Sequence, residues 1–286
     1  MQIFATALWD ALNRFLNKGG TVRASHVALS MMLAIFPFCL LALSLAGVVS
    51  RIGLTGSETE LGDILNLVFG SWPDTIADPI EGEVRAVMET SDGSIITLGA
   101  LLTILFASNG FDAIRIAVSE AYHDRDPRPL WKRRLIAAGF AVGGALLVTV
   151  SGLFGVVIPV YVRLVSEYAP ILHLDIVTHE TVVFWLTSFV LLAGLVAIHK
   201  WLPGVKRPLK AILPGVILTV VLWVIIAYGF DFYVRNFPTY SVTYAGLAGV
   251  IAALVFMYLM SAVLVLGAEY NARLGEIAQA RRRQSS

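Results

Sequence analysis

The stretch IITLGALLTILFASNGFDAIRIAVSEA, residues 95–121, decides the fold class of this chain. It is long enough for an α-helix to cross the hydrocarbon core of a bilayer, which takes about 20 apolar residues. Its second half nevertheless contains Asn109, Asp112 and Arg115. Ionisable groups in a span usually face a bundle interior or a water-filled cavity, because exposure to lipid costs on the order of 3 kcal/mol. The stretch therefore predicts a membrane helix with one polar, protein-facing end.

The whole chain has the composition of a membrane protein. Of its 286 residues, 57% are hydrophobic and 14% are charged, whereas soluble domains carry roughly 25% charged residues. Its apolar runs are continuous, unlike the alternating segments of a membrane β-barrel. We therefore predict an all-α membrane protein with a six-transmembrane-helix bundle in one domain, residues 21–273, preceded by a helix in residues 1–20 and followed by a basic tail, residues 274–286. The six predicted spans are residues 24–50, 95–121, 135–161, 181–201, 211–233 and 244–270.

Basic residues are distributed unevenly between the predicted loops. Sixteen of the 21 Lys and Arg residues lie before the first span, in the second-to-third and fourth-to-fifth loops, and in the tail. Because Lys and Arg remain preferentially on the cytoplasmic side, both termini are expected in the cytoplasm. The net charge of +1 provides no general attraction for nucleic acid. The basic segment HDRDPRPLWKRR, residues 123–134, is explained by the preference of Lys and Arg for the cytoplasmic side and by their attraction to anionic lipid. We therefore expect membrane lipids as partners and no nucleic acid.

The N-terminal residues 1–20 have the pattern of an amphipathic helix. Apolar side chains recur at three- and four-residue spacing from Ile3 to Leu16, and polar residues occupy the remaining side. Such a helix lies in the membrane interface or packs under the bundle as a lid, and amphipathicity does not separate the two. The long acidic first external loop, residues 51–94, repeats helical spacing twice, which predicts short helices over the outer face.

Polar residues gather at one depth of the predicted bundle. At 1.5 Å per residue, Asp112 and Arg115 lie about 25 and 30 Å along the second span, near its cytoplasmic end, and their i,i+3 spacing places them on one face. The cluster has two interpretations: a substrate vestibule or gate, or ion pairs that fix the helix ends. Its candidate residues are Asn109, Asp112, Arg115, Glu120, Glu269, Asn271 and His26.

Two prolines and one histidine-rich segment complete the candidate features. Pro37 and Pro214 lie inside predicted spans, where the missing N–H predicts a helix kink of the kind that transporters use at binding sites. His173, Asp175 and His179 are of metal-ligand type, but their spacing matches no zinc signature and a solvated loop explains them as well. The chain has no phosphate-binding glycine loop and no nucleophile elbow, so we expect neither an enzyme nor a cofactor.

Three stretches resemble the YihY/BrkB family of bacterial inner-membrane proteins, also catalogued as ribonuclease BN. They are ASHVALSMMLAIFPF in residues 24–38, RRL in residues 133–135 and TYAGLAGVIAALVFMYLMSAVLVLGAEYNARL in residues 243–274. The last is the most specific, since it ends in a Gly-Ala-Glu-Leu-Asn-Ala-like motif, with Tyr270 departing from the usual residue. The resemblance implies a multi-pass protein of the bacterial inner membrane. It implies no catalytic residues, and the scattered histidines of this chain do not support the ribonuclease name.

Two functions are compatible with these patterns. The first is an envelope transporter or lipid-handling protein with a polar vestibule on the cytoplasmic side, which the kinked spans and polar cluster favour. The second is a non-catalytic membrane scaffold that binds an envelope partner, or forms a homo-oligomer. A ribonuclease is a third hypothesis, for which the residues give no support.

Cysteine labelling distinguishes a vestibule from sealed ion pairs. Single cysteines at positions 109, 112, 116 and 269 on a Cys39→Ala background are treated with a membrane-impermeant thiol reagent from each side. A vestibule predicts labelling at 109 and 112 from the cytoplasmic side, because water then reaches into the bundle. Protection at both, with position 269 still labelled, would indicate a sealed polar pair.

Overall fold

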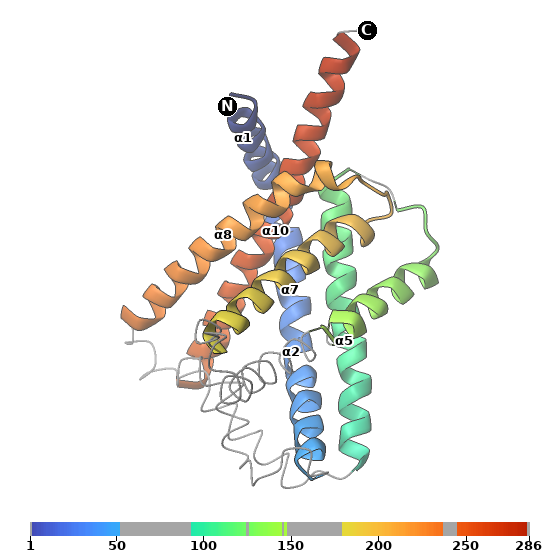
Figure 1. The fold of residues 1–286 in the computed structure, drawn as a ribbon, viewed down its shortest axis with the longest axis vertical. Helices are drawn as coiled ribbons and strands as arrows, with labels where there is room; N and C mark the ends of the chain where they lie inside the picture. The colour runs from blue at the N-terminus through green and yellow to red at the C-terminus, as the bar shows by residue number, and fades with distance from the viewer. Residues whose placement is uncertain are drawn as a thin grey trace, which may run out of the picture.

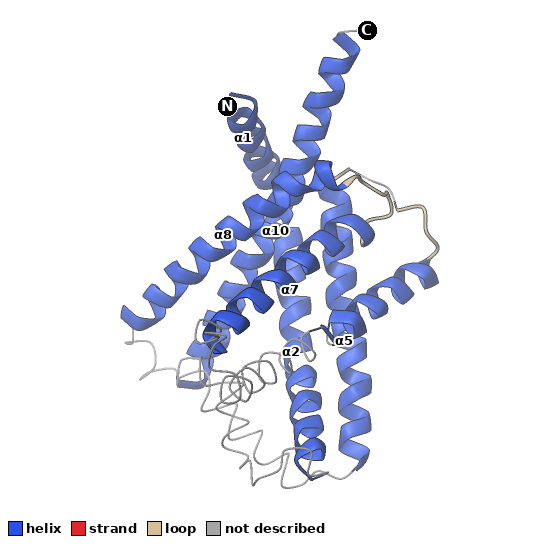
Figure 2. Cartoon of the chain, viewed as in Figure 1, coloured by secondary structure: helices blue, strands red, loops and turns tan. Residues whose placement is uncertain are grey.

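The computed structural model of the chain describes residues 2–51, 93–123, 126–144, 146–147, 179–236 and 245–284. Helices form nearly all of these ranges, and none of them contains a strand (Figure 2). One further helix, which has no label, spans residues 130–144. The labelled helices are α1 (Gln2–Asn17), α2 (Gly20–Arg51), α5 (Gly93–Ala121), α7 (His179–Trp201), α8 (Leu209–Asn236) and α10 (Ala245–Gln284).

The described helices agree with the all-α prediction. Within the described ranges, four segments are long and apolar enough to cross a membrane, namely Leu101–Ala121, Phe184–Trp201, Leu209–Tyr233 and Gly249–Gln284. The third predicted span is described only in its first half, and the predicted helices of the first external loop lie outside the described residues. The number of six spans and the side of the membrane that each end faces therefore stay predictions.

Both prolines of the predicted kinks lie inside continuous helices. Pro37 is within α2 and is buried, and Pro214 is in the second turn of α8. Each removes one helical N–H and leaves the carbonyl four residues earlier without its usual donor. The helices nevertheless continue past both residues, and the size of any kink stays a prediction.

Two consecutive glycines join α1 to α2. Gly19 has a φ of +75°, a left-handed conformation that glycine adopts without steric cost, and it ends α1. A Cβ on Gly20 would collide with the side chain and carbonyl of Phe15. The two glycines therefore form a tight bend between α1 and α2, and Phe15 joins the main core.

The two termini lie at the same end of the molecule, where α1 and the C-terminal part of α10 project beyond the other helices (Figure 1). Among the residues whose burial the structure describes, the buried side chains also concentrate toward this end, which we call the polar end because the polar cluster lies there too. Small side chains let α2, α5 and α10 approach closely. The core combines Ala24, Val27, Ala113, Ala117, Val118, Ala121, Leu195, Leu202, Val216, Leu264, Val265, Ala268 and Ala272.

Helices α8 and α10 touch through their backbones at two glycines. A Cβ on Gly215 would collide with the carbonyl oxygen of Gly267 and with the side chain of Asn271. A Cβ on Gly267 would collide with the hydroxyl of Thr219. Thr219 donates its hydroxyl hydrogen to the Gly215 carbonyl at 2.8 Å and is fully buried. The crossing therefore tolerates no side chain on either glycine.

We predict that Gly215→Ala and Gly267→Ala each destabilise the protein, because one extra methyl must push two helices apart. Overpacking of this kind costs about 1–3 kcal/mol. The measurement is the thermal midpoint of the purified protein in detergent. Gly229→Ala in the same helix α8 is the control, since a Cβ there meets no atom within 4 Å. Equal midpoints for all three variants would contradict the close crossing.

Candidate functional site

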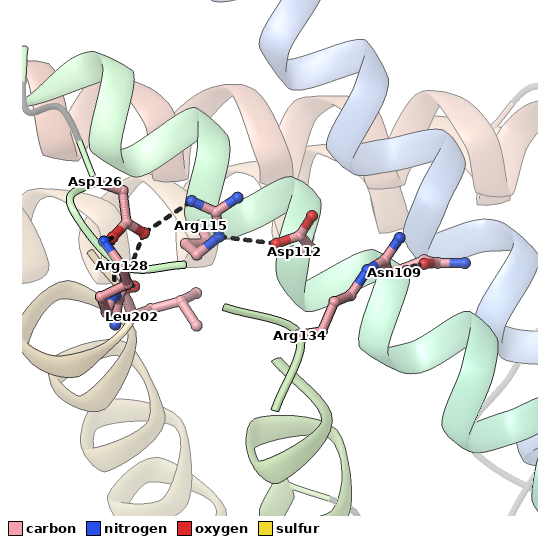
Figure 3. A network of polar contacts seen from close by, with 7 residues as sticks. All are labelled: Asn109, Asp112, Arg115, Asp126, Arg128, Arg134 and Leu202. Atoms are coloured by element: carbon pink, nitrogen blue, oxygen red, sulfur yellow. Dashed lines mark hydrogen bonds and ion pairs between the residues drawn. The ribbon is translucent and has the colours of Figure 1, made fainter. Parts of the chain in front are cut away.

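A chain of charged side chains connects α5 to the loop that follows it (Figure 3). Arg115 is buried and donates from Nε to Asp112 at 2.8 Å and from Nη1 to Asp126 at 3.0 Å. The i,i+3 pair predicted from the sequence is therefore present, and a second carboxylate joins it. One guanidinium thus bridges two carboxylates on different parts of the chain.

Asp126 is the centre of this network. Its side chain is only 4% exposed, and both of its oxygens accept hydrogen bonds from Arg128 at 2.8 Å. Arg128 also donates to the carbonyl of Leu202, at the end of α7, at 2.6 Å. The hydrogen bonds from Arg128 and the neighbouring positive charges lower the pKa of Asp126 to about 2. The network therefore attaches the loop of residues 126–129 to two helix ends.

A separate hydrogen bond joins the helix that follows this loop to the middle of α5. Arg134, in the helix of residues 130–144, donates to the side-chain oxygen of Asn109 (Figure 3). Three of the predicted cluster residues, Asn109, Asp112 and Arg115, thus have partners in residues 112–134. We call Asn109, Asp112, Arg115, Asp126, Arg128 and Arg134 the α5 network.

Three consecutive residues of α10 point to three different helices. Glu269 is 1% exposed and accepts from Arg23 of α2 at 3.3 Å. Tyr270 packs against Ala7 and Ala11 of α1. Asn271 accepts from the backbone N–H of Gly215 in α8 at 2.6 Å and donates to the carbonyl of Ile212 at 2.8 Å. Successive residues are about 100° apart around an α-helix, so one turn of α10 contacts all three neighbours.

Tyr122 links this turn of α10 to α7. Its hydroxyl accepts from the Asn271 amide at 3.1 Å, and its ring lies 4.2 Å from the guanidinium of Arg207. The ring also meets the edge of His199, with centroids 6.3 Å apart. His199 is completely buried and directs Nδ1 to the Leu195 carbonyl at 3.0 Å. Since a carbonyl only accepts, Nδ1 carries the hydrogen and Nε2 is left as an acceptor.

Three buried atoms that can accept a hydrogen bond have no partner among the described residues. They are Nε2 of His199, Oε2 of Glu269 and Oγ of Ser119. Buried polar atoms are nearly always hydrogen-bonded in proteins, so a further donor beside any of these atoms would be favourable. A protonated amine, a hydroxyl or water supplies such a donor.

The structure divides the predicted polar cluster into separate groups. Glu269 and Glu120 share Arg23, with Glu120 3.8 Å away and largely exposed. Asn271 holds α8, and His26 is an exposed residue of α2. Within the described ranges, no three residues of metal-ligand type are grouped together. His173 and Asp175 lie outside the described residues, as does the side chain of His179.

Several residues of the site were not predicted from the sequence. Asp126, Arg128, Tyr122, Arg207 and Arg23 form its central contacts. One signal was available, because Asp126 and Arg128 stand between prolines in DPRP and Asp126 is an acid within a basic segment. Tyr122 had no such signal, since its position depends on how α5, α8 and α10 pack.

The helices and their buried polar end define an all-helical membrane protein. Residues 11–286 match the family described as Virulence factor BrkB, and the chain belongs to that family. This confirms the resemblance seen in the sequence.

Three relatives that match along most of the chain come from bacteria. The chain is 24% identical over 267 residues to a ribonuclease-like protein, YfkH, of Bacillus subtilis, covering 93% of this chain and 94% of that protein. It is 23% identical over 261 residues to a UPF0761 membrane protein of Pseudoalteromonas atlantica, covering 90% and 82%. A UPF0761 membrane protein of Aggregatibacter aphrophilus is 23% identical over 274 residues, covering 96% and 92%. No solved structure matches the chain.

We predict that Asp126→Asn lowers stability at neutral pH by on the order of 2–3 kcal/mol, because a depressed carboxylate pKa measures stabilisation by its partners. The folded pKa lies below the usual value of 3.8, so this contribution is complete above pH ~4 and is lost as the pH falls toward ~2. Chemical denaturation of wild type and variant in detergent checks this. The difference between them should shrink over that interval, and a constant difference would contradict the assignment.

Proposed function

We propose that this protein is a lipid-handling transporter of the bacterial inner membrane, and that its polar end receives the headgroup of an amphiphilic substrate. The observation that carries the proposal is the carboxylate of Glu269, buried in a membrane helix with one oxygen lacking a partner in the described chain. Buried ionisable groups in membrane helices are costly and commonly serve substrate or ion pathways. A headgroup donor would complete the hydrogen bonding of this oxygen.

The apolar surfaces support a substrate with hydrocarbon chains. Toward the end of the molecule opposite the polar end, the described parts of α7, α8 and α10 expose large apolar side chains. Lipid tails are as apolar as these side chains, so a lipid substrate can reach the protein from within the bilayer, whereas a small hydrophilic solute cannot. A lipid would thus place its polar and apolar parts against matching parts of the protein. Exposed members include Phe184, Trp185, Phe189, Val224, Ile225, Tyr228, Phe232, Val250 and Ile251.

The proposal includes no catalytic step. Its membrane location agrees with the names of the UPF0761 relatives. The name of the Bacillus subtilis relative describes a ribonuclease-like protein, but the described residues of this chain group no three acids, histidines or cysteines that would bind a metal ion. We expect purified protein to leave single-stranded RNA intact. Cleavage that co-purifies with the wild-type protein and is lost when one of its residues is mutated would contradict this part of the proposal.

A non-catalytic scaffold is the second candidate. It is favoured by the α5 network, in which Asn109, Asp112 and Arg115 all have protein partners. Polar residues that hydrogen-bond to other protein side chains stabilise helix ends and need no substrate. Under this alternative the polar end only holds the bundle together while other surfaces bind an envelope protein.

A lipid-movement assay separates the two candidates. The full chain is reconstituted into liposomes that contain a trace of NBD-labelled phosphatidylglycerol, and dithionite reduces the label in the outer leaflet. Transport predicts reduction beyond the outer-leaflet fraction in wild-type liposomes. Glu269→Gln should slow this movement several-fold, because the amide keeps the size of the side chain but replaces one of the two acceptor oxygens, to which a hydroxyl of the glycerol headgroup would donate, with an NH₂ group.

Glu276→Gln is the matched control. Glu276 also lies on α10 and pairs with Arg14 at 2.7 Å and Arg273 at 2.8 Å, but it is on the α1 side and partly exposed. Thermal midpoints verify that both variants are folded. Equal loss of lipid movement in both would assign Glu269 a structural role only. Folded wild type without lipid movement would favour the scaffold.

A further inference from the structure

Helix α1 has two apolar faces with different surroundings. Ala7 and Ala11 are completely buried against Tyr270 of α10. Two ion pairs hold this face in place, because Arg14 contacts Glu276 at 2.7 Å and Asp10 contacts Arg273 at 2.8 Å. The small alanines allow α1 to lie close to α10. Part of α1 therefore packs on protein, along α10, and the two alternatives for this helix, an interfacial helix or a lid under the bundle, stay predictions.

The second apolar face of α1 is exposed. It consists of Phe4, Leu8, Leu12 and Leu16, together with Trp9, which is 64% exposed. It contains no charged residue, and the polar residues Asp10 and Arg14 belong to the side that contacts α10. The fold thus leaves a row of large apolar side chains in need of an apolar environment.

The spacing of this row favours a broad surface over a partner helix. Phe4, Leu8, Leu12 and Leu16 are each four residues apart, so the row advances about 40° around the helix at every step. A coiled-coil seam needs alternating spacings of three and four to remain on one line. A wide, drifting apolar face is typical of helices that lie in a lipid interface.

Two further exposed tryptophans lie near the ends of the connections at the polar end. Trp131 is 69% exposed and Trp201 is 54% exposed. The hydrogen bond from Arg128 to the Leu202 carbonyl places these two connections side by side. Lys200 lies 5.1 Å from the centre of the Trp201 ring. Tryptophan and lysine together are characteristic of the boundary between hydrocarbon and headgroups.

The charge of this end selects the kind of lipid. Exposed basic residues surround it, whereas among the described acids Asp126 and Glu276 are paired with arginines. Phosphate-bearing anionic headgroups complement such a surface, and each basic residue near a membrane contributes about 1 kcal/mol of attraction. A second copy of the chain would bring the same positive charge. The exposed basic residues are Lys18, Lys132, Arg134, Lys206, Lys210, Arg281, Arg282 and Arg283.

We propose that the exposed face of α1 inserts into the leaflet at the polar end and that the basic residues around it bind anionic phospholipid headgroups. The helix α10 supports α1 from the other side through Tyr270 and the two ion pairs. The proposed contact between α1 and lipid does not depend on a substrate. It therefore applies whether the protein transports lipid or acts as a scaffold.

The test places an NBD fluorophore on single cysteines of the full chain on a Cys39→Ala background. Leu8→Cys reports the exposed face, and Asn17→Cys, an exposed polar position on the opposite side of α1, is the control. Nanodiscs of equimolar phosphatidylcholine and phosphatidylglycerol carry a doxyl quencher on one lipid or the other. Quenching at position 8 should exceed that at position 17 several-fold. Doxyl-phosphatidylglycerol should quench position 8 more strongly than doxyl-phosphatidylcholine, and added salt should narrow this difference.

A charge variant separates the headgroup contribution from insertion. The triple change R281Q, R282Q and R283Q should reduce the preference for phosphatidylglycerol and leave quenching by doxyl-phosphatidylcholine unchanged. Access of aqueous iodide to position 8 without doxyl quenching would show that the face is in water and would overturn the proposal. Disulfide formation between two copies of the unlabelled Leu8→Cys variant, without doxyl quenching of the labelled one, would overturn it as well and assign the face to a second copy.

Discussion

The buried polar groups of α10 impose the constraint on which the rest of the structure depends. An unpaired polar group in an apolar interior costs several kcal/mol, so Glu269 and Asn271 require partners from neighbouring helices. Arg23 supplies one from α2, and the backbone of residues 212–215 supplies another from α8. Tyr270 between them packs on α1. One helical turn therefore determines where three helices lie.

This constraint explains why the small residues occur where they do. Asn271 reaches the backbone of α8 only if the two helices nearly touch, and Gly215 and Gly267 remove the side chains that would prevent it. Alanines at 24, 113, 117 and 268 provide the same closeness between α2, α5 and α10. Interhelical hydrogen bonds and small residues thus act together to hold α8 and α10 in contact. This combination is common in membranes, because the hydrophobic effect does not drive helices together there.

The polar end has two kinds of polar group with different roles. Arg115 forms hydrogen bonds with Asp112 and Asp126 and so attaches the following loop to α5. Arg128 of that loop attaches it to the end of α7. Glu269 and His199 each keep one acceptor without a partner in the described chain. The first kind is explained by stability alone. The second kind is where a ligand donor would gain most, which is why the proposed function rests on Glu269.

The sequence by itself determined the all-α membrane class, the α5 helix with its Asp112–Arg115 pair, and family membership, because each depends on local length, spacing or motif. The grouping of the polar residues was decided only by tertiary structure. Sequence placed Asn109 and Glu269 in one cluster, but helix rotation directs Asn109 to Arg134 and Glu269 to Arg23. Arg128 and Tyr122 likewise became central only through contacts between segments far apart in the chain, with Leu202 and Asn271 respectively. Depth along a helix follows from residue number, whereas the facing partner depends on how whole helices pack.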